Sequence, residues 1–114
     1  MAFTRNPRAI GFVAGVAAFA ASLVVPPPSG MPPEALRVAG IAALMAAWWI
    51  TEVIPVPATA LLPLILFPLL GVSPLAETSA PYADPIVFLF LGGFILGAAT
   101  QRWALHTRIG LGIV

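Results

Sequence analysis

Few side chains in this sequence of 114 residues are of the types that do chemistry. Its five basic and four acidic residues are Arg5, Arg8, Glu34, Arg37, Glu52, Glu77, Asp84, Arg102 and Arg108. No nucleophile has a base beside it, no two carboxylates have a spacing suited to acid–base work, and no glycine loop could hold a phosphate. One histidine, His106, and no cysteine leave too few ligands for a metal. We therefore predict no catalytic, substrate-binding or metal-binding residue, no cofactor and no enzyme.

The composition indicates a lipid environment. Hydrophobic residues make up 61% of the chain and charged residues only 8%, whereas a soluble domain carries about 25% charged residues. So few charged residues cannot form the surface of a water-soluble domain. The lipid bilayer is therefore the expected partner. A net charge of +1 without any basic cluster argues against a nucleic-acid partner.

Four apolar segments lie between the charged residues. A crossing needs roughly 20 mostly apolar residues, and we predict transmembrane helices at approximately 9–25, 36–51, 57–70 and 85–101. The runs are continuous and do not alternate, which favours an all-α integral membrane fold over a β-barrel. The second segment is short, and it gains length only if Arg37 snorkels outward.

Prolines shape the ends and interiors of these segments. Three of them, at 26–28, stop the first helix sharply. Pro63 and Pro68 lie inside the third segment and predict a kinked helix that ends at Gly71. The start of the chain also resembles a cleavable signal peptide, with Arg5 and Arg8 before an apolar run. We favour an uncleaved helix, because further apolar segments come after it.

Arginines set the expected topology. Four crossings place both ends of the chain on one side, which holds four of the five arginines, so the N-terminus is predicted to be cytoplasmic. The chain then divides into a cytoplasmic segment 1–8, a four-helix transmembrane region 9–105 and a cytoplasmic segment 106–114. The last segment either lies in the membrane interface or begins an element whose remainder is missing, and we favour the second interpretation.

Small residues and two acids are the structural candidates. Gly11 and Gly15 lie one helical turn apart, as do Gly93 and Gly97, and such pairs let helices approach closely in lipid. Two interpretations stay open for them: packing seams, within one chain or between subunits, and chance composition.

Asp84 before Pro85 is typical of a helix N-cap. Glu52 is enclosed by apolar sequence on both sides. A carboxylate inside a membrane tends to be functional, but the prolines after it mark a turn. We favour a cap on the third helix over a role in ion translocation.

Two stretches resemble a known family. WWITEVIPVP at 48–57, continued by TALLP at 59–63 and FPLLGV at 67–72, resembles the N-terminal signature of the divalent anion:sodium symporters, which carry dicarboxylates, citrate or sulfate. FLFLGGF at 88–94, with Trp103 after it, resembles the fourth helix of that family and its exit.

The resemblance implies a part of a longer secondary transporter in the plasma membrane, built from inverted repeats and forming homodimers. The four helices would be the scaffold of an elevator-type carrier of a small anionic substrate, with sodium as the coupling ion. The family's ligands lie in two Ser-Asn-Thr motifs, which this sequence lacks, so no substrate or sodium ligand is assigned. The alternative is a complete four-helix membrane protein that acts as an interaction or assembly partner. The coding sequence after Val114 would decide between them.

Overall fold

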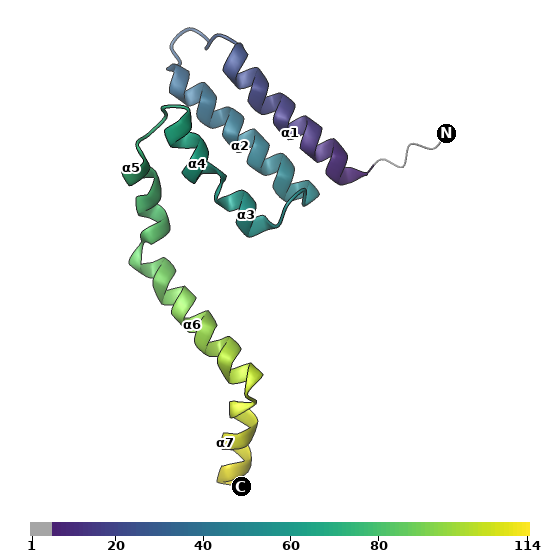
Figure 1. The fold of residues 1–114 in the computed structure, drawn as a ribbon, viewed down its shortest axis with the longest axis vertical. Helices are drawn as coiled ribbons and strands as arrows, with labels where there is room; N and C mark the ends of the chain where they lie inside the picture. The colour runs from purple at the N-terminus through teal and green to yellow at the C-terminus, as the bar shows by residue number, and fades with distance from the viewer. Residues whose placement is uncertain (1–5) are drawn as a thin grey trace, which may run out of the picture. The chain divides into compact units, whose positions relative to one another are not determined.

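The computed structural model describes residues 6–114, in which the regular elements are all helical (Figure 1). Residues 1–5, which include Arg5 and most of the predicted segment 1–8, lie outside the described residues. The chain divides into two compact units, one ending at Thr78 and the other running from Ser79 to Val114. The all-α membrane fold expected from the sequence is confirmed.

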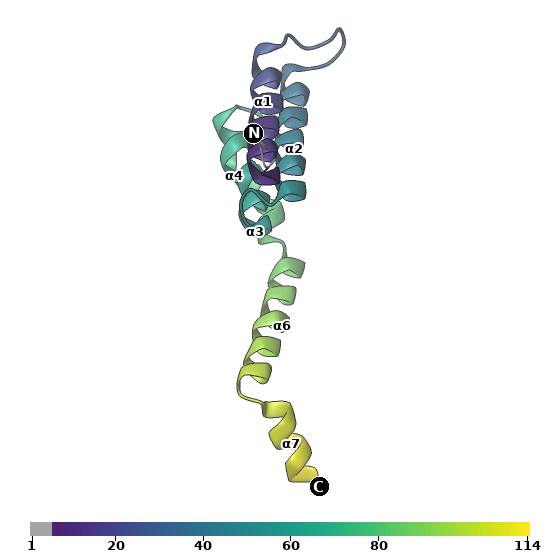
Figure 2. The ribbon, with the colours of Figure 1, turned by 90° about the vertical axis from the view of Figure 1, so that its right-hand side faces the viewer.

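The first unit begins with an antiparallel pair of long helices, α1 (Pro7–Val24) and α2 (Pro33–Thr51). Asn6 caps α1 by accepting a 3.1 Å hydrogen bond from the Arg8 N–H, and prolines occupy the first turn of both helices, where no N–H is needed. Figures 1 and 2 show the two helices side by side along their whole length.

The α1–α2 contact supplies most of the core of this unit. Ile41 and Leu44 of α2 are 1% and 5% exposed. The rings of Phe12 and Trp48 stack across the pair with centroids 5.6 Å apart. Trp48 therefore packs between the two helices.

The predicted third crossing, 57–70, is two short helices, α3 (Val56–Ala60) and α4 (Leu62–Leu69), which both pack on α2. The break falls at Leu61, two residues before Pro63. A proline ring clashes with the carbonyl four positions earlier, which is that of Thr59, so the disturbance lies upstream of the proline itself. The expected kink is present, but it interrupts the helix.

The end of α4 is held from α2. Gly71 adopts a φ of 69°, and the Val72 N–H donates to the Phe67 carbonyl at 2.9 Å, a C-terminal arrangement for which glycine is the usual residue. The Arg37 Nη1 donates a 2.7 Å hydrogen bond to the Leu70 carbonyl. Arg37 thus turns toward the end of α4, while its depth in a membrane stays a prediction. Beyond Gly71, α5 (Leu75–Ser79) buries Thr78.

The second unit contains a short 3-10 helix, η1 (Ala80–Ala83), then α6 (Pro85–Arg102) and α7 (Leu105–Ile113). Neither α6 nor α7 has a buried residue among those described. They are separated by Ala104, whose φ is 48°. The predicted segment 106–114 is therefore mostly the helix α7.

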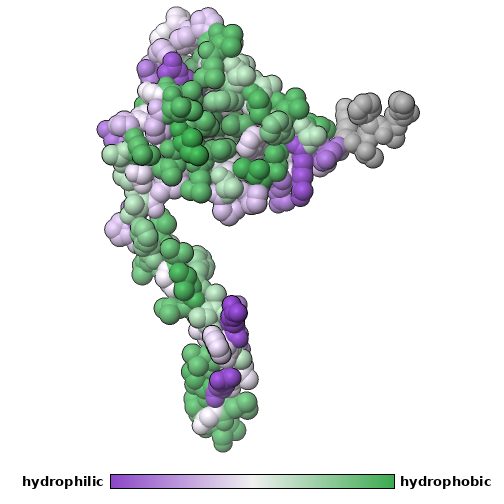
Figure 3. Space-filling model, viewed as in Figure 1, coloured by the Kyte–Doolittle hydropathy of each residue, from purple (hydrophilic) through white to green (hydrophobic). Residues whose placement is uncertain are grey.

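Within residues 6–114, α1, α2 and α6 are long and apolar enough to span a membrane, while Val56–Leu69 is apolar but shorter. Hydrophobic side chains cover much of the visible face of α1 to α4 and of α6 (Figure 3). The described chain has three helices of membrane length where four were expected. The N-in topology stays a prediction.

Candidate functional site

Glu52 ends α2 and does not cap the third helix. Its backbone lies in the left-handed region, with φ 47° and ψ 48°, which costs an ordinary residue about 1–2 kcal/mol. The N–H groups of Glu52 and Val53 both donate to the Trp48 carbonyl, the second at 3.3 Å. The N-cap of α3 is Pro55, without a side-chain hydrogen bond. The cap interpretation was therefore wrong, because the hydrogen bonds that close α2 place Glu52 before the turn.

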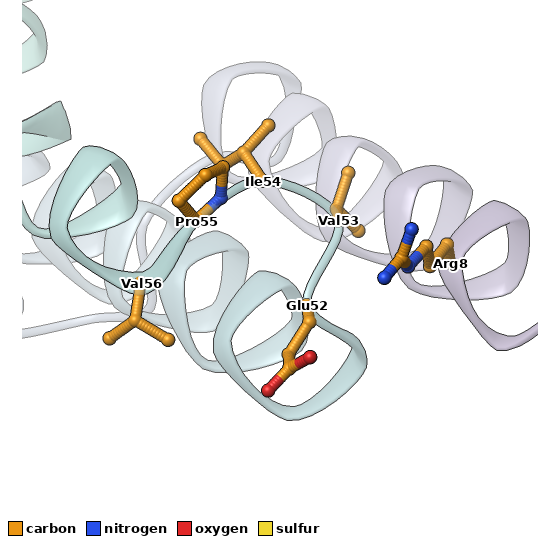
Figure 4. Close-up of a pocket in the computed structure, with 6 residues that line it drawn as sticks. All are labelled: Arg8, Glu52, Val53, Ile54, Pro55 and Val56. Atoms are coloured by element: carbon orange, nitrogen blue, oxygen red, sulfur yellow. The ribbon is translucent and has the colours of Figure 1, made fainter.

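Glu52 lines a cavity of about 370 Å³ together with Arg8 of α1. Figure 4 shows Arg8 reaching in from the first turn of α1, while the other residues come from the end of α2 and the loop after it. These remaining lining residues are Val53, Ile54, Pro55 and Val56. Among the described residues that line the cavity, one side chain is cationic and one is anionic.

The first glycine pair forms a real seam. Gly11 and Gly15 are both buried in α1. A methyl group at Gly11 would overlap the Thr51 side chain, and one at Gly15 would lie 2.9 Å from Trp48 Cδ1. The packing interpretation is confirmed here, within one chain.

Gly40 of α2 completes the same seam from the opposite helix. It is buried, and an added methyl group there would overlap the Ser22 side chain. Ser22 is fixed in turn because its Oγ donates a 2.6 Å hydrogen bond to the Phe19 carbonyl. Sequence reasoning missed Gly40, since it has no second glycine one turn away.

The second glycine pair has a different environment. Added methyl groups at Gly93 and Gly97 would meet nothing within 4 Å among the described residues, and both glycines are exposed. Within this part of the chain α6 therefore makes no seam through them.

Asp84 is the N-cap of α6, as predicted. Its Oδ1 accepts a 2.8 Å hydrogen bond from the Ile86 N–H, and Pro85 occupies the first helical position. The role is structural, since the carboxylate satisfies one of the free amides of the first turn.

Two buried polar atoms were not foreseen. Thr59 is fully buried in α3, and its Oγ1 has no hydrogen-bond partner in the described chain; the same holds for Trp48 Nε1. No pattern of the sequence marks them, because their burial depends on contacts between separate helices.

No group of three histidine, aspartate or glutamate residues lies close enough to hold a metal within residues 6–114. The long apolar helices and their glycine seam define the class of the molecule: it is a multi-pass α-helical membrane protein.

Comparison with known proteins specifies the family. A family model described as "Sodium:sulfate symporter transmembrane region" matches residues 7–114, so the chain belongs to this family. It is 46% identical over 105 residues to a "Sodium-dependent dicarboxylate transporter SdcS" of Staphylococcus saprophyticus, and this match covers 92% of the chain and 20% of the relative. It is 45% identical, with the same coverage, to a protein of that name from Staphylococcus aureus strain bovine RF122.

The chain thus spans about a fifth of the length of the curated relatives it matches. No solved structure matches it.

Proposed function

We propose that this chain is part of a secondary transporter that carries small divalent anions across the plasma membrane, with sodium as the coupling ion, and that it takes no part in catalysis. The single observation that carries the proposal is the family match over residues 7–114. The names of the relatives add dicarboxylates as the substrate class, while the description of the family adds sulfate.

The geometry is compatible with a scaffold role in such a carrier. Close seams such as that of Gly11, Gly15 and Gly40 build a firm helix pair. The interruption at Leu61 gives the discontinuous helices that are common in secondary transporters. We assign no substrate or sodium ligand to residues 6–114. We further propose that the complete transporter is a homodimer.

Uptake into proteoliposomes tests the proposal. The protein expressed from its own gene is reconstituted, and the initial rate of labelled succinate uptake is measured with an inward sodium gradient and with choline in its place. We expect uptake with sodium only, and competition by unlabelled divalent anions. Vesicles that hold residues 1–114 alone should take up no more than empty vesicles.

Sodium coupling, anion transport and the dimeric state are tested by separate results. Uptake of equal rate in sodium and choline would refute sodium coupling and leave anion transport in place. No uptake of succinate, citrate or sulfate by the complete protein would refute transport, and would favour a helical assembly partner. Light scattering of the purified protein decides whether it is a dimer.

A further inference from the structure

The junction between α6 and α7 concentrates positive charge. Residues 85–114 include Arg102, His106 and Arg108 but no aspartate or glutamate. All three side chains are exposed. Neither guanidinium forms a hydrogen bond or an ion pair with another residue of the described chain. Two arginines therefore stand near a helix boundary without an intramolecular counter-charge.

The backbone at this junction adds free donors. Ala104, in the left-handed region, precedes α7, which has no side-chain cap. The Thr107 and Arg108 N–H groups both donate to the Ala104 carbonyl. The Leu105 and His106 N–H groups have no such acceptor in the described chain, and free amides at a helix N-terminus favour an anion.

Apolar side chains lie directly beside these donors. Trp103 is 67% exposed, and Leu105 and Ile109 are 46% and 55% exposed. Tryptophan is enriched at the level of the lipid headgroups. Figure 3 shows the hydrophilic atoms of the lower part of α6 and of α7 gathered on one flank, with hydrophobic atoms over the rest of the visible face. At this junction, groups that can bind an anion therefore lie beside apolar side chains that can contact acyl chains.

We propose that this junction, defined by Arg102, Trp103, His106 and Arg108, binds the phosphate group of an anionic phospholipid. Guanidinium groups bind phosphate oxygens with two donors, and the neighbouring apolar side chains fit the upper acyl chain. A soluble anion would use only the charged half of the surface. The excess of arginine favours the cytoplasmic side for this junction, and anionic lipids lie in the leaflet on that side.

Native mass spectrometry of the complete purified protein tests the proposal. The protein is titrated in detergent with phosphatidylglycerol and, in parallel, with phosphatidylcholine of the same acyl chains. We expect preferential retention of phosphatidylglycerol. Arg102→Gln and Arg108→Gln should each weaken its binding about fivefold, the equivalent of about 1 kcal/mol per arginine.

Arg8→Gln is the matched control, since it removes the same charge from an exposed arginine of the other unit. It should leave phosphatidylglycerol binding unchanged. A double Arg102→Lys and Arg108→Lys variant keeps both charges and should retain most of the preference, which separates loss of charge from loss of fold. Equal retention of the two lipids by the parent protein, or an equal loss in Arg8→Gln, would overturn the proposal.

Discussion

The Arg37 guanidinium on α2 donates a 2.7 Å hydrogen bond to the backbone carbonyl of Leu70 at the end of α4, 33 positions along the chain. The last carbonyls of a helix have no partner within it, and they carry the negative end of the helix dipole. A cation placed there satisfies both conditions. One side chain thereby fastens the interrupted segment α3–α4 to the long helix beside it.

Replacing Arg37 should loosen this attachment. A hydrogen bond to a charged group contributes about 1.5–3 kcal/mol, so Arg37→Met should lower the thermal unfolding temperature of the purified protein in detergent by several degrees. Arg37→Lys should recover part of the loss. Arg8→Gln is the control, because the Arg8 side chain is exposed and makes no hydrogen bond or ion pair within the described chain. An unfolding temperature unchanged by Arg37→Met would show that the hydrogen bond contributes nothing.

The two glycine pairs should respond in opposite directions to a single methyl group. Gly11→Ala and Gly15→Ala insert a carbon into the α1–α2 seam, which we expect to destabilise the protein by about 1–3 kcal/mol. Gly93→Ala meets open space and removes a flexible residue from a helix, so it should stabilise by about 0.5–1 kcal/mol. Thermal unfolding of the three variants gives the comparison. If Gly93→Ala strongly destabilises the protein, another helix packs against α6 at this position.

Glu52 and Ala104 are the described residues other than glycine with positive φ. Glycine adopts this conformation without strain, so Glu52→Gly and Ala104→Gly should each raise the unfolding temperature, by an amount equivalent to about 1 kcal/mol. Unfolding in detergent is again the measurement. If Glu52→Gly lowers the temperature while Ala104→Gly raises it, the carboxylate makes a stabilising contact that outweighs the backbone strain.

Loss of the Asp84 cap should affect the first turn of α6. Asp84→Ala removes the acceptor of the Ile86 N–H and should cost about 0.5–2 kcal/mol. Hydrogen–deuterium exchange of a peptide that covers the start of α6 should then be faster, while peptides of α1 stay unchanged. Asp84→Asn keeps an accepting oxygen and should exchange nearly as slowly as the parent. Equal exchange in the alanine variant would exclude a capping role.

The positions of the long helices could be predicted because the residues at their ends are charged residues or prolines, which can be recognised in the sequence. The observed α1, α2 and α6 differ by three residues or fewer at each end from the ranges 9–25, 36–51 and 85–101. Charges, prolines and the Asp84–Pro85 pair mark these limits, and each acts on the local backbone.

The features that could not be predicted depend on contacts between distant segments. The close contact at Gly40 is made with the side chain of Ser22, which lies on another helix. The turn of Arg37 toward α4 depends on where α4 ends. The left-handed conformation of Glu52 could not be foreseen either, because a helix end of this kind is recognised in a sequence by glycine, and here the position is glutamate.

The interruption at Leu61 has a consequence for the surrounding lipid. The helices α3 and α4 have 5 and 8 residues, which at about 1.5 Å per residue amount to roughly 20 Å end to end. The hydrocarbon layer is about 30 Å thick, and a short apolar segment is matched by thinning of the bilayer beside it. The acyl chains next to α3 and α4 should therefore be compressed, so that the bilayer is thinner there. Beside α1 the bilayer should keep its ordinary thickness.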